Sequence, residues 1–242
     1  EVNQAPAADA GGQDARTHQL VAEARHWLRP RGLVALTAGR ALHQVARGLT
    51  RLILGLKVEG LEHLPAKGPV VITPNHVSDL DPVVLGGALD GRHAQEVVWG
   101  AIRERLFTNV PGRVLARIAH MVPVDDRAPG ASLAVGTEVL HQGHILVWFP
   151  EEWRAPDGRL QRFLPGIGRL LLDTQARAVP CYIDGTFEAM PRGARLPKAH
   201  TVTVRFGPPV SAVELAGPDA TPEAVADALR AKVAALSERA QP

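Results

Sequence analysis

The stretch from Val70 to Pro82 places the strongest limits on the fold of this chain. Its first four residues favour β structure and run into Pro74 and Asn75, which break a strand. Pro82 suits the first turn of a helix, where a missing N–H costs nothing. The stretch therefore predicts a buried strand, a tight turn and a helix start, with His76 displayed where the strand ends.

Similar short apolar runs alternate with helical patterns along the rest of the chain. Predicted strands lie within residues 57–64, 69–73, 96–101, 121–124, 144–149, 179–183 and 201–206. Predicted helices span residues 17–29, 33–56, 82–89, 102–119 with a break at Pro111-Gly112, 131–142, 166–178 and 221–239. This alternation indicates an α/β fold: a mixed, largely parallel central sheet flanked by helices, preceded by an N-terminal amphipathic helical pair.

Composition limits the classes of function. With 45% hydrophobic residues, the 242-residue chain can bury a substantial core. The single cysteine, Cys181, cannot form an internal disulfide, and no cluster of Cys and His has zinc spacing, so we expect no metal site. No run of about 18 apolar residues predicts a membrane-spanning helix. The basic region lacks the interleaved aromatics of a nucleic-acid site, so we expect no nucleic-acid partner.

The chain divides into three expected segments. Residues 1–15 are small and polar without any period, which predicts a disordered linker or tail and favours a domain cut from a longer polypeptide. Residues 16–56 carry the predicted basic amphipathic helices, since eight Arg or Lys stand against one acid between Arg16 and Lys57. Residues 57–242 hold the predicted α/β domain.

The predicted helix at 33–56 has two distinct faces. Its apolar face comprises Leu42, Val45, Ala46, Leu49, Leu52, Ile53 and Leu56. Its opposite face comprises Arg40, His43, Gln44, Arg47 and Arg51. Such a helix can lie in a membrane interface, where each basic residue near anionic lipid contributes about 1 kcal/mol. In the alternative, the apolar face packs on the helix's own domain and the basic face is solvated.

His76 and Asp81 are the first candidates for chemistry. Asp81 lies about one helical turn after His76, so its carboxylate can accept a hydrogen bond from one imidazole nitrogen. The other nitrogen is then free to take a proton from a substrate hydroxyl. The competing interpretation is structural: Asp81 before Pro82 is also an ordinary pair at a helix N-terminus.

A second charged loop follows the predicted strand at 144–149. In open α/β sheets ligands bind beyond the strand ends. Arg154 offers a planar guanidinium that suits a phosphate or carboxylate. Glu151 is a candidate to accept from a substrate hydroxyl or to hold Arg154 in place. Arg127 also follows a predicted strand and is a second candidate for binding an anion. The alternative for all three is a salt-bridged surface loop.

Together these loops resemble the PlsC-type glycerolipid acyltransferases. His76 and Asp81 match that family's H-x-x-x-x-D motif, with Asn75 before the histidine, and residues 149–154 (Phe-Pro-Glu-Glu-Trp-Arg) resemble its F-P-E-G-T-R block. Arg127 matches the basic residue of the block between them. Residues 179–185, which end in Gly185, resemble the fourth block. The order and spacing agree over roughly residues 55–210.

The resemblance implies transfer of a fatty acyl group from acyl-CoA or acyl-carrier protein to a hydroxyl of a lysophospholipid or acylglycerol phosphate. His76 would be the general base and Asp81 would fix its tautomer, without an acyl-enzyme and without a cofactor. N–H groups near the start of the helix after Asp81 would stabilise the oxyanion. Glu151, Arg154 and Arg127 would orient the acceptor, with Asn75 and Gly185 also in the substrate site. Peripheral contact with the cytoplasmic face of the membrane is implied as well.

Two departures from the family pattern bear on the acceptor, and two other functions stay open. Glu152 and Trp153 replace the usual Gly and Thr, which is expected to reshape the acceptor pocket. The same His-Asp pair can activate water, as in a thioesterase or lysophospholipase. A lipid-binding module without turnover is the other alternative. Ser78 lacks the G-x-S-x-G surroundings of a nucleophile, and Cys181 is predicted to be core.

Overall fold

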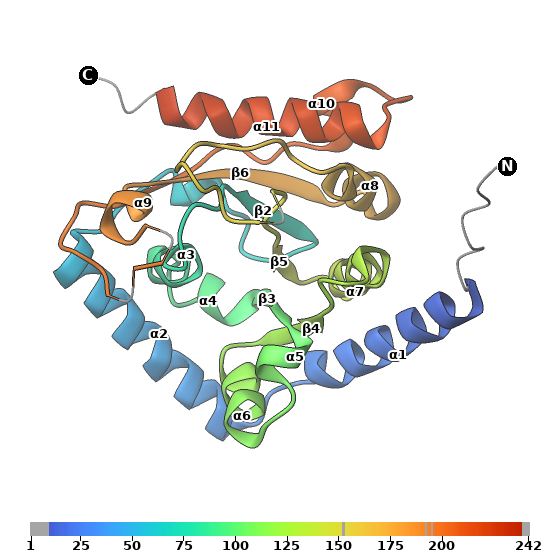
Figure 1. The fold of residues 1–242 in the computed structure, drawn as a ribbon, viewed down its shortest axis with the longest axis horizontal. Helices are drawn as coiled ribbons and strands as arrows, with labels where there is room; N and C mark the ends of the chain where they lie inside the picture. Colours follow the sequence, from blue (N-terminus) through green and yellow to red (C-terminus); the bar gives the residue numbers. More distant parts are fainter. Residues whose placement is uncertain (1–9, 152, 192, 195, 239–242) are drawn as a thin grey trace, which may run out of the picture.

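The computed structural model describes residues 10–151, 153–191, 193–194 and 196–238. Its centre is a seven-stranded sheet in the order β1-β7-β6-β2-β5-β3-β4 (Figure 1). The strands are β1 (Lys57–Glu59), β2 (Val70–Pro74), β3 (Val97–Ile102), β4 (Met121–Val124), β5 (Ile145–Val147), β6 (Arg177–Asp184) and β7 (Thr203–Phe206). The predicted fold class, a mixed and largely parallel sheet flanked by helices, is confirmed.

The sheet is parallel except between β6 and β7. Strand β2 lies between β5 and β6, with Ile72 opposite Val147 on one side and Val179 on the other. All five residues of β2 are buried, as the apolar run at its start predicts. Because β2 to β6 all run in one direction, the loops that follow them meet at one edge of the sheet.

Helices cover both faces of the sheet. They are α1 (Ala10–Leu28), α2 (Leu33–Leu54), α3 (Asp81–Ala88), α4 (His93–Glu96), α5 (Arg103–Leu106), α6 (Val110–Ile118), α7 (Pro129–His141), α8 (Pro165–Thr174), α9 (Thr186–Ala189), α10 (Ala212–Ala216) and α11 (Pro222–Glu238), with a 3₁₀ turn at Leu61–His63. Successive β2 side chains point to opposite faces: Val71 joins the core beneath α1, α7, α8 and α11, whereas Ile72 joins the core beneath α3.

Several predicted elements differ in extent from the structure, and the short helices α4, α9 and α10 were not predicted. Strand β5 ends at Val147, before the predicted end of the strand at 144–149. Helix α8 ends at Thr174, because Gln175 adopts a left-handed conformation (φ 53°) and the chain then enters β6. Pro111 and Gly112 begin helix α6 instead of interrupting a helix: the Asn109 side chain caps it by accepting from the Gly112 N–H.

The two N-terminal helices run along opposite sides of the molecule and meet near α6 (Figure 1). Helix α1 begins at Ala10, so it includes the second part of the segment expected to be a disordered tail; residues 1–9 lie outside the described residues. Ion pairs tie α1 to the domain, one between Arg16 and Asp125 and one between Arg25 and Glu138. Its Trp27 side chain packs edge-on against Phe107.

Helix α2 packs on the domain through small and polar residues. Its buried residues are Gly39, His43, Thr50 and Leu54. The contact with α3 is close: a Cβ added at Gly87 would lie 2.5 Å from the Thr50 hydroxyl oxygen. Five residues of the apolar stripe are instead exposed, with fractions of 40% at Leu42, 57% at Val45, 50% at Leu49, 83% at Leu52 and 42% at Ile53, whereas Leu56 is buried. Most of this stripe therefore does not pack on the domain, and its contact with a membrane stays a prediction.

Among the described helices, none combines the length and the apolar character that a bilayer-spanning segment requires.

Candidate active site

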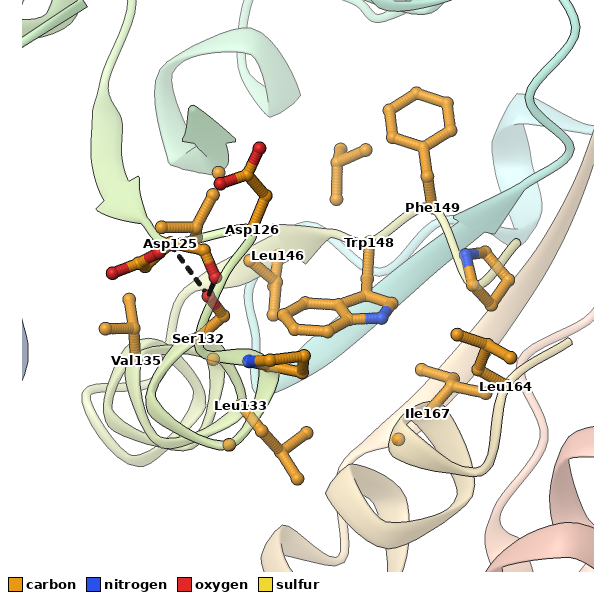
Figure 2. A pocket seen from close by; sticks show the side chains of 18 of the residues that line it. Asp125, Asp126, Ser132, Leu133, Val135, Leu146, Trp148, Phe149, Leu164 and Ile167 are labelled. Atoms are coloured by element: carbon orange, nitrogen blue, oxygen red, sulfur yellow. Dashed lines mark hydrogen bonds between the residues drawn. The ribbon is translucent and has the colours of Figure 1, made fainter. Parts of the chain in front are cut away.

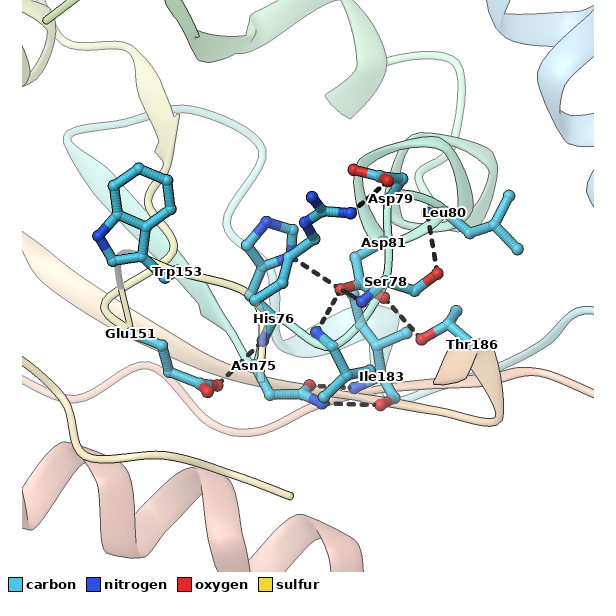
Figure 3. Close-up of polar contacts among 12 residues, drawn as sticks. Asn75, His76, Ser78, Asp79, Leu80, Asp81, Glu151, Trp153, Ile183 and Thr186 are labelled. Atoms are coloured by element: carbon cyan, nitrogen blue, oxygen red, sulfur yellow. Dashed lines mark hydrogen bonds and ion pairs between the residues drawn. The ribbon is translucent and has the colours of Figure 1, made fainter. Parts of the chain in front are cut away.

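His76 and Asp81 form a hydrogen-bonded pair at the end of β2 (Figure 3). The Nδ1 atom of His76 lies 2.8 Å from Oδ2 of Asp81, as the spacing predicts. Because an ionised carboxylate only accepts, Nδ1 carries the hydrogen and Nε2 keeps its lone pair. Within the described residues, Nε2 has no hydrogen-bond partner. The His76 side chain is 17% exposed, so a substrate can reach it.

The Asp81 carboxylate is fully buried and held by several donors. Its Oδ2 atom also accepts from the backbone N–H groups of Val77 (2.7 Å) and Ser78 (2.8 Å). Its Oδ1 atom accepts from the hydroxyl of Thr186 at 2.6 Å. Asp81 is the first residue of α3, and Pro82 follows in its first turn. These donors fix the carboxylate where it can hold the His76 ring.

Asn75 clamps the end of β2 to β6. Beyond Pro74, which lies opposite Cys181, the two strands no longer pair through their backbones. The Asn75 amide continues the ladder: its nitrogen donates to the Ile183 carbonyl at 2.9 Å, and its oxygen accepts from the Ile183 N–H at 2.7 Å. The side chain thereby fixes where His76 leaves the sheet. A contact between Asn75 and substrate stays a prediction.

Glu151, in the loop after β5, supports the backbone of the first loop. It accepts from the His76 N–H at 2.9 Å and from the Gln161 N–H at 3.0 Å. In addition, the Ala155 N–H donates to the His76 carbonyl at 2.9 Å. Burial raises the pKa of the Glu151 carboxyl, an effect opposed by the N–H groups of Gln161 and His76. Glu151 therefore joins the two predicted motifs, and its contact with an acceptor hydroxyl stays a prediction.

Arg154 forms an ion pair with Asp79, not with Glu151. Asp79 lies within the loop between His76 and Asp81 and is largely exposed. Of the two residues that depart from the family pattern, Trp153 is 59% exposed at the mouth of the site, and Glu152 lies outside the described residues. The Arg154 guanidinium stands at the site entrance with a carboxylate already beside it.

The other two predicted site residues lie farther out. Arg127 is exposed after β4, three strands from β2 in the sheet order, a separation of about 14 Å at ordinary strand spacing. Gly185 follows β6 and has φ 85°. A Cβ there would lie 2.3 Å from the Thr201 carbonyl oxygen, so only glycine fits this turn. Within the part of the chain that the structure describes, neither residue forms a hydrogen bond with His76 or Asp81, and their substrate contacts stay predictions.

A largely apolar cavity of about 480 Å³ lies next to the loop after β5, and its lining includes Phe149 (Figure 2). The Phe149 ring, whose centroid lies 4.3 Å from that of His76, lines its near end. Trp148, Leu164 and Ile167 form its walls, and Asp125, Asp126 and Ser132 lie at another part of its lining. The volume is within the usual range for sites that bind small ligands.

Other groups in the described residues are poor candidates for chemistry. The Ser78 hydroxyl is buried and donates to the Met190 carbonyl at 2.7 Å. Burial raises the pKa of the Cys181 thiol, which lies inside β6. Carboxylates of Glu104, Asp125 and Asp126 lie within 4.8 Å of one another. Asp125 is also paired with Arg16.

A sequence model of the family described as Acyltransferase matches residues 55–184, more than half of the 242-residue chain. The chain belongs to the acyltransferase family. The resemblance noted in the sequence is thereby confirmed at the level of the family. The matched segment contains both loops and the cavity walls contributed by β3, β4 and β5.

Curated relatives of this acyltransferase-family chain carry names that include their substrate. One from Limnanthes douglasii, named 1-acyl-sn-glycerol-3-phosphate acyltransferase, is 27% identical over 194 residues, which are 76% of this chain and 65% of that protein. Another from Homo sapiens, 1-acyl-sn-glycerol-3-phosphate acyltransferase alpha, is 30% identical over 186 residues, 74% of this chain and 63% of that protein. The matches thus span less than two thirds of these relatives.

One solved structure shares the fold. The crystal structure of the 1-acyl-sn-glycerophosphate (LPA) acyltransferase PlsC from Thermotoga maritima superposes with a TM-score of 0.67 at 20% sequence identity. The match covers 95% of this chain and all of that one. At this identity the likeness establishes the fold of the acyltransferase-family chain.

Sequence reasoning missed three residues that touch the predicted pair or its loops. The Thr186 hydroxyl donates a hydrogen bond to Asp81, although Thr186 lies 105 residues later in the chain. Phe149 packs against the His76 ring, and Asp79 pairs with Arg154. Each stands next to a matched motif or within one. Their position in or beside the matched blocks indicated that they could belong to the site, but the neighbouring sequence did not show which side chains they would contact.

Proposed function

We propose that this chain transfers a fatty acyl group from an acyl-CoA or acyl-carrier-protein thioester to the free hydroxyl of a lysophospholipid. Acylglycerol phosphate is the first acceptor to consider, because the curated relatives are named for it. The observation that carries the proposal is the His76–Asp81 pair, in which a buried carboxylate fixes Nδ1 and leaves Nε2 accessible.

In the proposed reaction, Nε2 of His76 takes the proton of the acceptor hydroxyl. The hydroxyl oxygen attacks the thioester carbonyl carbon, and the tetrahedral intermediate collapses to form the ester and break the C–S bond. The imidazolium returns its proton to the departing thiolate. Asp81 stabilises the imidazolium between these steps. No acyl-enzyme is needed in this scheme. The hydrogen bond from the Ser78 hydroxyl to the Met190 carbonyl and the full burial of Cys181 support this.

Hydrogen bonds within the loop narrow the source of oxyanion stabilisation. The N–H groups of Val77 and Ser78 are directed to Asp81, and that of Leu80 is directed to the Ser78 hydroxyl oxygen. The N–H of Asp81 donates to the Ser78 carbonyl. These four N–H groups are therefore already used, and we do not assign them to the oxyanion. Among the described residues, the N–H of Val83 in the first turn of α3 has no such bond, so the helix start stays the proposed source of oxyanion stabilisation.

The cavity lined by Phe149 is proposed to hold the fatty acyl chain. Its lining is mostly apolar, and Phe149 links its near end to the His76 ring. Burying a methylene group in such surroundings contributes about 0.8 kcal/mol, so a long chain binds tightly there. Because Phe149 touches both the cavity and the His76 ring, a chain in the cavity is proposed to bring its thioester toward His76.

Arg154 and Arg127 are proposed to bind the acceptor phosphate or another anionic part of the substrates. Arg154 stands near His76 and suits the acceptor, because a guanidinium can contact two phosphate oxygens at once. Arg127 lies beside the part of the cavity lined by Asp125 and Asp126. Glu151 would act through the loop that carries His76.

Peripheral contact with a membrane is proposed to run through α2. Its exposed stripe of Leu42, Val45, Leu49, Leu52 and Ile53 can enter the lipid interface, while Arg40 and Arg51 on its flanks are exposed. Lysophospholipid acceptors reside in that interface. We place this contact at the cytoplasmic face of the membrane, where anionic lipids attract basic residues.

The decisive test measures transfer of labelled acyl groups from acyl-CoA, and separately from acyl-carrier protein, to a panel of lysolipids. Wild-type protein is compared with His76→Ala and Asp81→Asn. His141→Ala, which removes an exposed histidine from the end of α7, is the matched control. We expect product with wild type and with the control, and a loss of at least about 1,000-fold with His76→Ala.

Other outcomes identify the alternatives. Free fatty acid released without any acceptor would identify a thioesterase or lysophospholipase that uses the same pair. Vesicle binding without turnover of any donor and acceptor would identify a lipid-binding module. Equal product from wild type and His76→Ala would refute the assignment of His76 as the base.

A further inference from the structure

Two separate segments of the chain hold the Asp81 carboxylate. Its Oδ2 atom accepts from His76, Val77 and Ser78, which all lie in the same loop as Asp81. Its Oδ1 atom accepts from Thr186, which follows β6. Both Asp81 and Thr186 are fully buried. Among the described residues, the donor to Oδ1 is Thr186, which lies outside the loop of residues 75–81 (the catalytic loop).

The position of Thr186 is fixed by its own surroundings. It begins α9 immediately after Gly185, whose φ of 85° turns the chain close to Thr201. At the other end of α9, the Met190 N–H donates to the Thr186 carbonyl at 2.9 Å, and the Met190 carbonyl accepts from the Ser78 hydroxyl. Helix α9 therefore docks on the catalytic loop at two points, one of which is the Thr186 hydroxyl.

We propose that Thr186 is a positioning residue for the His76–Asp81 pair, acting through its hydroxyl bond to Oδ1 of Asp81. This inference rests on the proposed acyl transfer. With Oδ1 held, the carboxylate plane cannot rotate, and Oδ2 stays on Nδ1 of His76. Thr186 is fully buried, and its hydroxyl donates to Asp81 and not to His76. Gly185, predicted as a substrate residue, serves this arrangement by allowing the turn that delivers the threonine.

Removal of the hydroxyl has a defined consequence. In Thr186→Val the volume is nearly kept, but a buried carboxylate oxygen loses its donor. The less stabilised carboxylate then either accepts a stronger hydrogen bond from the imidazolium or takes up a proton itself. Either way the pair becomes protonated at a higher pH. The acidic limb of the kcat profile should therefore move to higher pH by about one unit.

The experiment compares Thr186→Val with Thr186→Ser, which keeps the hydroxyl. Thr73→Val is the matched control, because Thr73 is also fully buried but donates to the Val179 carbonyl instead of a carboxylate. We expect kcat for acyl transfer to fall about tenfold or more in Thr186→Val. The KM values for donor and acceptor should stay unchanged, since Thr186 binds neither. Thr186→Ser should restore both kcat and the pH profile.

The outcomes separate this inference from the proposed function. Inactive wild-type protein would refute the proposed function itself. Active wild type with inactive His76→Ala, but an unchanged pH profile in Thr186→Val, would refute only the role of Thr186. An equal loss of kcat in Thr73→Val would show a general effect of removing a buried hydroxyl and would also overturn the inference. If circular dichroism shows that Thr186→Val does not fold, Thr186→Ala gives the same comparison without added bulk.

Discussion

The Arg154 guanidinium is paired with the Asp79 carboxylate at the entrance to the site, so the group best suited to bind a phosphate already has an anionic partner. Asp79 is 63% exposed and the Arg154 side chain 29% exposed. A phosphate must displace Asp79 from the guanidinium or share the guanidinium with it. The pair is thus placed to weaken binding of acceptors with a strongly charged head group.

Replacement of Asp79 by Asn should improve use of a phosphate-bearing lysolipid. Since exposed ion pairs contribute up to about 1 kcal/mol, the KM for lysophosphatidate should fall about two- to fivefold. The KM for an uncharged acceptor such as monoacylglycerol should not change. Asp157→Asn removes an exposed carboxylate farther along the Arg154 loop and serves as the control. A higher KM for lysophosphatidate in Asp79→Asn would contradict this role.

Loss of the exposed stripe on α2 should uncouple membrane binding from chemistry. In the triple variant Val45→Ser, Leu49→Ser, Leu52→Ser, three exposed apolar side chains are lost. Partition onto vesicles that contain anionic lipid, measured by sedimentation, should fall at least about tenfold. Activity toward short-chain, water-soluble substrates should persist. Leu196→Ser, at another exposed site, should leave partition unchanged; vesicle binding unaffected in the triple variant would exclude α2 from the contact.

A side chain at Gly136 should shorten the acyl chains that are used. Gly136 lies in the lining of the cavity, and a Cβ there would lie 3.2 Å from Cζ3 of Trp148. In Gly136→Val the added methyl groups occupy chain-binding space. Specificity for long over short acyl-CoA should fall about fourfold for each methylene excluded, as competition assays can measure. Gly48→Val, on a part of α2 without close neighbours, is the control. Unchanged chain preference would place the acyl chain elsewhere.

His120 should make the fold less stable in mild acid. Burial lowers the pKa of His120 to about 3, with Arg31 and His144 adding to the effect. The unfolded chain takes up a proton below pH 6.5, whereas folded His120 does not, so stability is lost as pH falls. Between pH 7 and pH 5 the contribution is about 2 kcal/mol.

His120→Asn should remove this contribution, because Asn tolerates the left-handed conformation of residue 120 (φ 55°). Urea unfolding at both pH values should show a loss smaller by about 2 kcal/mol than in wild type. Burial also lowers the pKa of His144, which acts in the same direction and remains in the variant. His141→Asn, at an exposed position, should behave as wild type. Equal losses in wild type and His120→Asn would show that His120 is solvated in the fold.

The local part of the site could be predicted from sequence, since His76 and Asp81 lie in one loop and their spacing fixes which atoms can meet. The order of the strands and longer helices, and the position of both loops at strand ends, followed from periodicity, whereas the short helices α4, α9 and α10 did not. Thr186 could not be found, because its partner depends on the sheet order that brings β6 beside β2.

Periodicity also fell short for α2. It identified the two faces of this helix but not which of them packs on the protein. The buried contact includes Gly39 and Thr50. Such small residues let the helix lie close to the protein, but a hydrophobicity scale does not mark them as buried. The pairing of Arg154 with Asp79 was similarly invisible, because both residues lie in loops whose paths only the fold determines.

The central position of β2 in the sheet affects the order in which the sheet and the site can form during synthesis. Both neighbours of β2 are made later: β5 precedes β6, and the donors to Asn75 and Asp81 lie 108 and 105 residues downstream. Because synthesis runs from the N-terminus, a growing chain carries His76 and Asp81 long before it carries Ile183 and Thr186. Until β5 is made, the apolar β2 strand lacks both of its neighbours in the sheet, and until β6 is made it lacks one of them. Catalytic competence is therefore among the last properties the nascent chain acquires.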